Sequence, residues 1–294
     1  MTKKSKKWAP FFYMFPALLF ILIFIYIPII ENFYYSFFKM NSYSDNVIFV
    51  GLQNYKRIFS DSIFYTALKN NGLYALISLI CQIGFGLFLA IILESSLINK
   101  KMKNIFRNIY FLPSLISITA IGLLWYFIYS PNIGLINAVL TQIGREDLTR
   151  AWLGNPKTAI FGVIAMSQWQ WVGYITMLLI VAIQKIPTEQ YEAAEIDGAS
   201  GVQKAFLITI PNIKEMTLVT SVITVIGAFQ LFTEVYILTM GGPYDSTQVL
   251  GTYMYDSAFI YDEMGYASAI AVIIFVITFT LSVLELKISK SGKE

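Results

Sequence analysis

Hydrophobic residues are concentrated in six blocks along the chain, and each block is about 20 residues or longer. A helix rises about 1.5 Å per residue, so about 20 apolar residues cross the ~30 Å hydrocarbon core of a bilayer. The predicted transmembrane helices are Pro10–Phe38, Asn71–Leu93, Ile105–Tyr129, Ala159–Ile183, Met216–Met240 and Tyr266–Leu286. No polar segment of domain size separates them. The pattern therefore predicts an all-α integral membrane protein with six transmembrane helices.

The N-terminal segment is similar to a secretory signal peptide, because four lysines precede its apolar run. The run is far longer than the apolar core of a signal peptide and shows no cleavage site with small residues. We therefore expect a retained first helix. Pro16 and Pro28 lie inside it, and a membrane helix tolerates such prolines.

Lysine and arginine are distributed unevenly between the loops. With six spans, 14 of the 21 basic residues fall on the side of the membrane that carries both termini. The last loop on the other side, Gly241–Gly265, contains no basic residue. Basic residues favour cytoplasmic loops, so both termini are expected in the cytoplasm of a multi-pass protein of the inner or plasma membrane. The expected parts are a basic cytoplasmic N-terminus (1–9), a transmembrane domain (10–288) with a cytoplasmic loop (185–214), and a cytoplasmic tail (289–294).

The composition argues against several kinds of chemistry. The chain has 56% hydrophobic residues, 13% charged residues, no histidine and one cysteine, Cys81. Without histidine, zinc-hydrolase and serine-triad sites are not expected, and no metal site is predicted. A membrane enzyme that works without histidine stays open. No Gly-x-x-x-x-Gly-Lys-Ser/Thr motif is present, so the chain is not expected to be its own ATPase or to bind a cofactor. The net charge of +3 gives no indication of nucleic-acid binding.

The cytoplasmic loop between the fourth and fifth spans has a specific pattern. Pro187 is expected to end the fourth span, and Thr188 to cap a short helix with Glu189 and Glu192 in its first turn. Asp197-Gly198 is a strong turn signal. A second amphipathic segment follows and is expected to stop at Pro211. From these residues alone, the loop is either a docking element for another protein or a helix on the membrane surface.

The loop also resembles the EAA motif of binding-protein-dependent ABC permeases of the maltose and glycerol-phosphate type. In that family the motif forms a coupling helix that sits in a groove of the ATPase subunit. Val202 and Glu215 depart from the pattern, where relatives usually carry tryptophan and proline. The resemblance implies a bundle like that of a type I ABC importer permease. The ATPase-coupling residues that it implies are Glu192, Ala193, Ala194, Asp197, Gly198, Ile208 and Pro211.

A second stretch extends the resemblance to carbohydrate permeases. Leu238-Thr239, Gly241-Gly242-Pro243 and Ser246-Thr247 resemble the outer end of their fifth span, and Tyr266–Ala269 resembles the start of their sixth. The resemblance implies a second homologous permease subunit, a cytoplasmic ABC ATPase dimer that uses the ATP, and an extracytoplasmic solute-binding protein. The other reading is an ion-coupled secondary transporter. That class usually shows internal repeats, which this sequence lacks.

Polar residues inside the spans are candidates for a substrate pathway, because they are costly in a bilayer. Amides and aromatic rings suit the hydroxyls and apolar faces of sugars. The candidates are Gln168, Trp169, Gln170, Gln230 and Glu234. Hydrogen bonding between helices of the bundle would explain the same residues equally simply.

Overall fold

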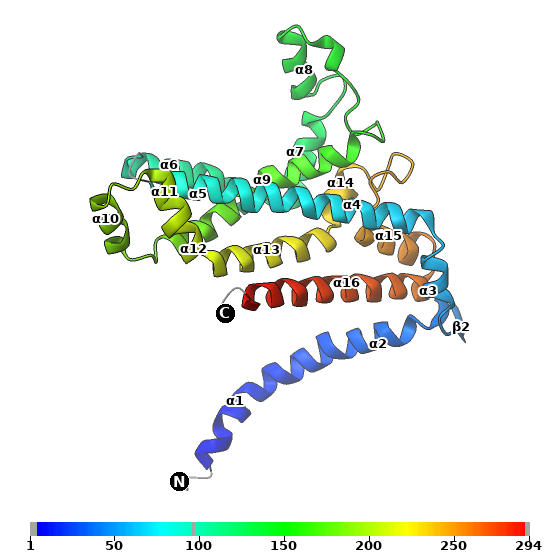
Figure 1. The fold of residues 1–294 in the computed structure, drawn as a ribbon. Coiled ribbons are helices and arrows are strands. Elements are labelled where there is room, and N and C mark those ends of the chain that lie inside the picture. The colour runs from blue at the N-terminus through cyan, green and yellow to red at the C-terminus, as the bar shows by residue number, and fades with distance from the viewer. Residues whose placement is uncertain (1–4, 96–97, 292–294) are drawn as a thin grey trace. The chain divides into compact units, whose positions relative to one another are not determined.

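The structure is a computed structural model, and it describes residues 5–95 and 98–291 of the 294-residue chain. The described residues are mostly helical, with one β-hairpin (Figure 1). The chain divides into two compact units. One contains Met1–Asp61 and Met254–Phe275, and the other contains Ser62–Tyr253 and Val276–Glu294.

The first unit contains the first span and the β-hairpin. Helices α1 (Ser5–Ile21) and α2 (Ile27–Tyr35) continue through a π-helical turn, and the apolar stretch of this span exposes its side chains, as expected for a lipid-facing helix. Strands β1 (Phe38–Asn41) and β2 (Ser44–Phe49) pair antiparallel, with Phe38 opposite Phe49. A short helix, α3 (Gln53–Ile58), follows.

The second unit contains most of the helical bundle. Its helices are α4 (Ser62–Ser78), α5 (Gly86–Glu94), α6 (Lys100–Phe111), α7 (Ile118–Ile128), α8 (Leu135–Gln142), α9 (Ala159–Ile183), α10 (Thr188–Ile196), α11 (Gly201–Lys204), α12 (Ile210–Asn212), α13 (Lys214–Phe229) and α14 (Thr233–Leu238). Helices α15 (Leu250–Tyr255) and α16 (Met264–Ser291) extend across the boundary between the units. A π-helical turn joins α4 to α5, so residues 62–94 form one long helix.

The predicted spans agree with the structure to different degrees. The fourth predicted span, Ala159–Ile183, has the same bounds as α9. The sixth, within α16, is longer than predicted, and the second extends back to Ser62. Four described helices are long and apolar enough to cross a membrane, or up to six if two bent pairs each count as one span.

The third and fifth predicted spans are not continuous helices. In the third, α6 and α7 meet at a 97° bend, where a 3-10 turn (Leu112–Leu115) contains Pro113 and Ile116 is extended. Proline removes a helical hydrogen bond and clashes with the preceding turn, which explains the break. The fifth span is interrupted between α13 and α14. The side-chain amide of Asn71 donates to the carbonyl of Ala228, 2.6 Å away, and so pairs a helical carbonyl just before the break.

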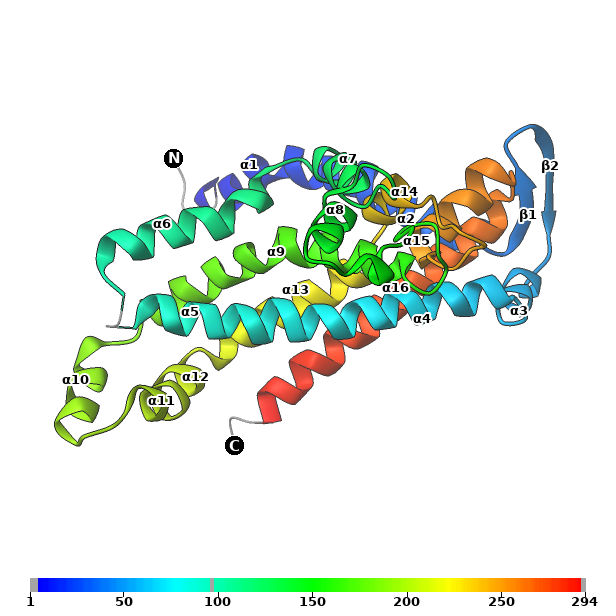
Figure 2. The same ribbon diagram turned by 90° about the horizontal axis from the view of Figure 1, so that it is seen from above.

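The core of the second unit lies between α5 and α9 and extends to the start of α13. Helix α5 lies alongside α9, and α4 alongside α13, in both views (Figures 1 and 2). The buried apolar residues of this core are Ile83, Ala90, Leu93, Ile175, Leu179, Ile180, Ile183, Ile186 and Ile213. In a membrane, close packing and interhelical hydrogen bonds hold such a bundle together. Helices α10 and α11 lie at the end of this core (Figure 2).

Candidate functional site

The first helix of the cytoplasmic loop begins at a proline. Pro187 has an extended backbone (φ −57°, ψ 132°) and is the N-cap of α10, so Thr188 is the first helical residue and not the cap. This corrects the expectation from the sequence. Of the two glutamates, Glu189 lies in the first turn and Glu192 one turn later. Proline is suited to this end of a helix because its missing N–H has no helical partner there.

The predicted turn at Asp197-Gly198 is present. Gly198 has φ +77°, a conformation that glycine adopts without strain. The N–H of Ala199 donates to the carbonyl of Ala194 (2.8 Å), and the N–H of Gly198 donates to that of Glu195 (3.1 Å). This is a Schellman motif, which satisfies the free carbonyls at the end of a helix. The end of α10 is therefore a defined structure.

The next helix begins with a signal that our sequence analysis did not use. Ser200 and Gln203 form a capping box: the Ser200 hydroxyl accepts from the Gln203 N–H, and the Gln203 side chain accepts from the Ser200 N–H. Ser-x-x-Gln is a recognisable sequence pattern for a helix start. The helical segment then continues from Gly201 through a π-helical turn to Asn212, one residue beyond Pro211.

The loop has two arms, α10 and the helical segment Gly201–Asn212, and hydrogen bonds and an ion pair join them. The hydroxyl groups of Tyr191 and Thr209 are 2.9 Å apart. Lys204 forms an ion pair with Glu195 (2.6 Å). The amide of Asn212 donates to the Gln190 side chain (3.1 Å). These three contacts join α10 to the segment Gly201–Asn212, so the two arms are held together at both ends of α10.

The loop also has an inner face that rests on the core of the bundle. Tyr191 and Ile208 pack against the buried cluster that includes Ile183, Ile186 and Ile213. Ile208, one of the residues that the resemblance implies for ATPase coupling, thus anchors the loop to the bundle. The packing fixes the loop to the ends of α9 and α13.

The outer face of the loop is open. Of the predicted coupling residues, Glu192, Ala193, Asp197, Gly198 and Pro211 are exposed, while Ala194 and Ile208 are partly buried. Apolar side chains are exposed beside them: Ile196 (87%), Val202 (68%), Phe206 (65%) and Leu207 (73%). Several exposed apolar side chains next to carboxylates are typical of a surface that binds a partner or a membrane.

The structure separates the predicted pathway residues. Gln168 is buried, donates to the Ser78 hydroxyl (3.0 Å) and accepts from the Gln82 amide (3.0 Å). Gln170 is buried and donates to the carbonyl of Ile116 (3.3 Å). Both amides thus form hydrogen bonds to other elements of the bundle, in agreement with the second explanation that the sequence left open. Trp169 is 44% exposed and its ring lies 5.8 Å from that of Trp125.

Glu234 lines a cavity of about 200 Å³ in the second unit. The cavity is also lined by Tyr74, Gln82, Trp171, Tyr174, Ile175, Ile223, Thr224, Gly227 and Ala228. Gln230 is exposed and does not line it. The cavity combines a carboxylate, an amide and aromatic rings, but Gln82, Trp171 and Tyr174 were not among the predicted residues. Trp171 and Tyr174 are adjacent to the predicted cluster in α9, and this proximity was the available signal.

A larger cleft of about 610 Å³ lies in the first unit, between the β-hairpin and the start of α16. Arg57 forms an ion pair with Glu263 (2.8 Å), and its guanidinium lies 4.1 Å from the ring centre of Tyr266. Asp262 accepts from the N–H of Ser42 (2.7 Å). The cleft joins two loops that are more than 200 residues apart, so no local sequence signal indicates it.

Comparison with known proteins identifies the family. The model of the binding-protein-dependent transport system inner membrane component family matches residues 82–287. The probable ABC transporter permease protein YurN of Bacillus subtilis is 52% identical over 290 residues, covering 99% of both chains. The arabinooligosaccharides transport system permease protein AraP of Bacillus subtilis is 35% identical, covering 98% of this chain and 91% of AraP.

Solved structures share the fold. A bacterial ABC transporter involved in the import of the acidic polysaccharide alginate contains a chain that superposes with a TM-score of 0.87 at 23% identity, covering 99% of this chain and 98% of that one. The prediction of an all-α importer-permease bundle is therefore confirmed. The fold, the family model and the full-length relatives agree, and the chain belongs to the binding-protein-dependent transport system inner membrane component family.

Proposed function

We propose that this chain is the membrane-spanning permease subunit of an ATP-driven importer, and that α10 and the start of α11 dock on a separate cytoplasmic ATPase. The main support for the proposal is the structure of this loop. It presents exposed carboxylates and apolar side chains on a base that is fastened by Tyr191, Glu195 and Gln190. An element held in this way can transmit a displacement, imposed by a partner, to the helices against which it packs.

The proposed assembly has several subunits. A second homologous permease would complete the membrane pathway, and an ATPase dimer would hydrolyse ATP, since this sequence lacks a phosphate-binding loop. The N-terminus, the loop at 185–214 and the C-terminus would lie in the cytoplasm, as the distribution of basic residues indicates. The docking residues would be Glu192, Ala193, Ala194, Asp197 and Gly198, with Ile208 and Pro211 supporting them.

The proposed cargo is an oligosaccharide. Relatives of this chain are named for arabinooligosaccharides, for diacetylchitobiose and for starch degradation products. The cavity lined by Trp171, Tyr174, Gln82 and Glu234 offers aromatic faces and polar groups, which suit sugar rings and hydroxyls. Gln168 would hold Gln82 in place, while Trp169, Gln170 and Gln230 would act elsewhere on the pathway or in packing.

An extracytoplasmic binding protein would deliver this cargo. With the proposed topology, the cleft of the first unit lies on the outer side of the membrane. One solved relative is an alginate transporter in complex with a periplasmic protein that holds an alginate pentasaccharide. The cleft, which is lined by Arg57, Tyr261 and Glu263, is the part of this unit best suited to contact such a protein.

Two substitutions test the docking proposal. Glu192→Arg reverses an exposed charge on α10, and Gly198→Val forces a β-branched residue into φ +77°. A Cβ at Gly198 meets no atom within 4 Å, so the valine acts through backbone strain and through the space that a partner needs. Oligosaccharide uptake should fall about tenfold or more, as for the loss of ~1.4 kcal/mol of docking free energy.

The ATPase subunit that co-purifies with the complex should decrease in both variants. Glu146→Arg, which reverses an exposed glutamate far from α10 in the sequence, is the matched control and should leave both measurements unchanged. Normal uptake and normal ATPase association in both loop variants would overturn the docking assignment.

A further inference from the structure

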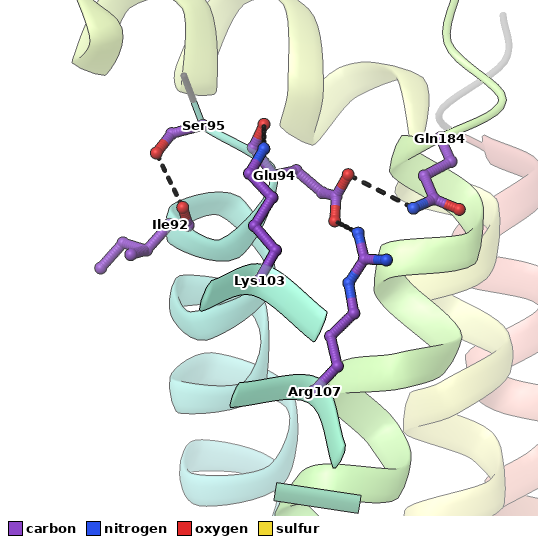
Figure 3. Close-up of polar contacts among 6 residues, drawn as sticks. All are labelled: Ile92, Glu94, Ser95, Lys103, Arg107 and Gln184. Carbon is purple, nitrogen blue, oxygen red and sulfur yellow. Dashed lines mark hydrogen bonds and ion pairs between the residues drawn. The ribbon is translucent and has the colours of Figure 1, made fainter. Parts of the chain in front are cut away.

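Side chains from the ends of α5 and α9 and from the middle of α6 meet at one carboxylate near the docking loop (Figure 3). Glu94, the last residue of α5, forms an ion pair through Oε1 with Nη2 of Arg107 in α6. Its other oxygen, Oε2, accepts from the side-chain amide of Gln184, 3.4 Å away, just after α9. The Nζ of Lys103 donates to the carbonyl of Glu94 (3.1 Å) and so caps the end of α5.

This ion pair is more enclosed than the others in the described part of the chain. The side chains of Glu94 and Arg107 are 16% and 19% exposed, whereas both partners of the Arg145–Asp147 pair are more than half exposed. A buried charge that loses its partner is strongly destabilising, so the two helices are tied at this point. The pair therefore fixes α6 to the end of α5.

The carboxylate of Glu94 is linked to the start of the docking loop through its hydrogen-bond partner Gln184. Gln184 lies four residues before Thr188, the first residue of α10. Between them, Ile186 is buried in the same core cluster as Leu93, the neighbour of Glu94. If the start of α10 moves, Gln184 is therefore displaced first, and its hydrogen bond transmits the movement to Glu94.

One hydrogen-bond donor in this group is not used. Nε of Arg107 is buried and has no hydrogen-bond partner in the described structure. Nε and Nη2 form one edge of the guanidinium group, and this edge can bind both oxygens of a carboxylate at once. The second oxygen of Glu94 is occupied by Gln184. Glu94 is thus shared between two partners, and in the observed arrangement Oε2 accepts from Gln184 and not from Nε of Arg107.

We propose that Glu94, Arg107 and Gln184 form a two-position joint that transmits movement of the docking loop to α5 and α6; this inference rests on the proposed docking of an ATPase. In the position observed, Gln184 holds Oε2 and Arg107 binds through Nη2 alone. When the root of α10 moves, Gln184 leaves, and Arg107 binds Glu94 through both Nε and Nη2. Each position satisfies a different donor, which gives the joint two discrete arrangements.

The joint connects to the rest of the pathway through α6. Helix α6 continues across the 97° bend into α7, and α7 packs against α14, which carries Glu234 of the cavity. A change in how Arg107 holds α6 can therefore reach the helices around the cavity. Glu94, Arg107 and Gln184 are positioning residues in this scheme, because they act through the helices that they join.

Distance measurements between spin labels test the joint without knowledge of the cargo. Labels are placed at Lys101 of α6 and Thr188 of α10, both exposed, in a Cys81→Ser background. The complete transporter is reconstituted in nanodiscs and measured with and without the ATP analogue AMP-PNP. With wild-type Glu94, Arg107 and Gln184, we expect two narrow distance distributions, and AMP-PNP shifts the population from one to the other.

The variants separate the parts of the proposal. Arg107→Gln removes the ion pair and should give a broad distribution that does not respond to AMP-PNP. Arg107→Lys keeps the charge but lacks the two-donor edge, so the nucleotide-dependent shift should be lost while the distribution stays narrow. The double charge reversal Glu94→Arg with Arg107→Glu should restore a narrow distribution. Arg145→Gln, which removes the exposed pair with Asp147, should behave like the wild type.

Two results would overturn the joint. One is a wild-type complex that binds its ATPase subunit but shows no shift with AMP-PNP. The other is an Arg107→Gln or Arg107→Lys variant that keeps the wild-type shift. A wild-type complex that does not bind an ATPase subunit at all would instead overturn the proposed function, so the two failures are distinguishable.

Discussion

At the scale of single residues, the bundle depends on close approaches between backbones. Gly173 in α9 faces the carbonyl of Tyr110 in α6, and a Cβ added at Gly173 would lie 1.7 Å from that oxygen. No heavy-atom contact is that short, so any larger residue must push α6 away from α9. Small residues at such points allow membrane helices to pack closely.

Gly173→Ala should therefore destabilise the fold strongly. Overpacking of a core costs about 1–3 kcal/mol, and a clash with rigid backbone belongs at the upper end of this range. The measurement is the thermal or denaturant unfolding midpoint of the purified protein in detergent. Gly72→Ala is the matched control, since a Cβ there meets nothing within 4 Å, and it should be neutral or slightly stabilising. Equal midpoints for the two variants would contradict this account of α6–α9 packing.

Residue-scale features were predictable from the sequence only where their cause is local. The turn at Gly198 follows from an Asp-Gly pair, and the cap at Ser200 from Gln203 three residues later. The partners of Gln168 lie 86 and 90 residues away in the sequence. Periodicity and composition cannot specify such pairs, so the sequence could not decide between a pathway residue and a structural one.

At the scale of elements, the spans followed from hydrophobicity but their interruptions did not. The bounds of α9 were predicted because polar residues, Lys157 and Gln184, flank its apolar run. The break between α13 and α14 contains no glycine or proline. There, Asn71 of α4 donates to Ala228 and accepts from the N–H of Leu250 (2.8 Å). We attribute the break to this tertiary contact, which joins residues more than 150 positions apart in the sequence.

Asn71→Leu should destabilise the structure at the interruption between α13 and α14. The substitution leaves the carbonyl of Ala228 and the N–H of Leu250 buried without the amide, and each unsatisfied group costs about 1–3 kcal/mol. A lower unfolding midpoint and reduced uptake are expected. Asn104→Leu, at an exposed position of α6, is the control for loss of an amide alone. If the two variants unfolded at the same midpoint, Asn71 would not stabilise the interruption.

At the scale of the whole molecule, the orientation in the membrane determines which surface can contact cytoplasmic partners and which can contact partners on the outer side. The excess of basic residues predicts that the loop at 185–214 lies in the cytoplasm and the β-hairpin on the outer side. Both faces carry exposed side chains that can report on this arrangement: Ile196 is 87% exposed and Tyr43 is 93% exposed. The family and the fold could be predicted from the sequence because the hydrophobic blocks extend over most of the chain and the EAA-like motif lies in a single loop between two of them.

Cysteine labelling tests the topology directly. In a Cys81→Ser background, Tyr43→Cys should react with a membrane-impermeant maleimide in intact cells. Ile196→Cys should react only after the membrane is permeabilised, because the distribution of basic residues predicts a cytoplasmic loop. The opposite pattern, or labelling of both positions from outside, would reverse or break the proposed orientation.

The central claim is that α10 contacts an ATPase, and photo-crosslinking from Ile196 tests it most directly. A photoreactive amino acid at Ile196 extends from the exposed face of the helix, and the same group at Tyr244, which is 93% exposed, is the control in the loop proposed to lie outside. On irradiation of the assembled transporter, we predict a covalent adduct of this chain with the ATPase subunit from position 196 and none from position 244. An assembled complex in which position 196 forms adducts only with lipid would contradict the claim and identify α10 as a membrane-surface helix.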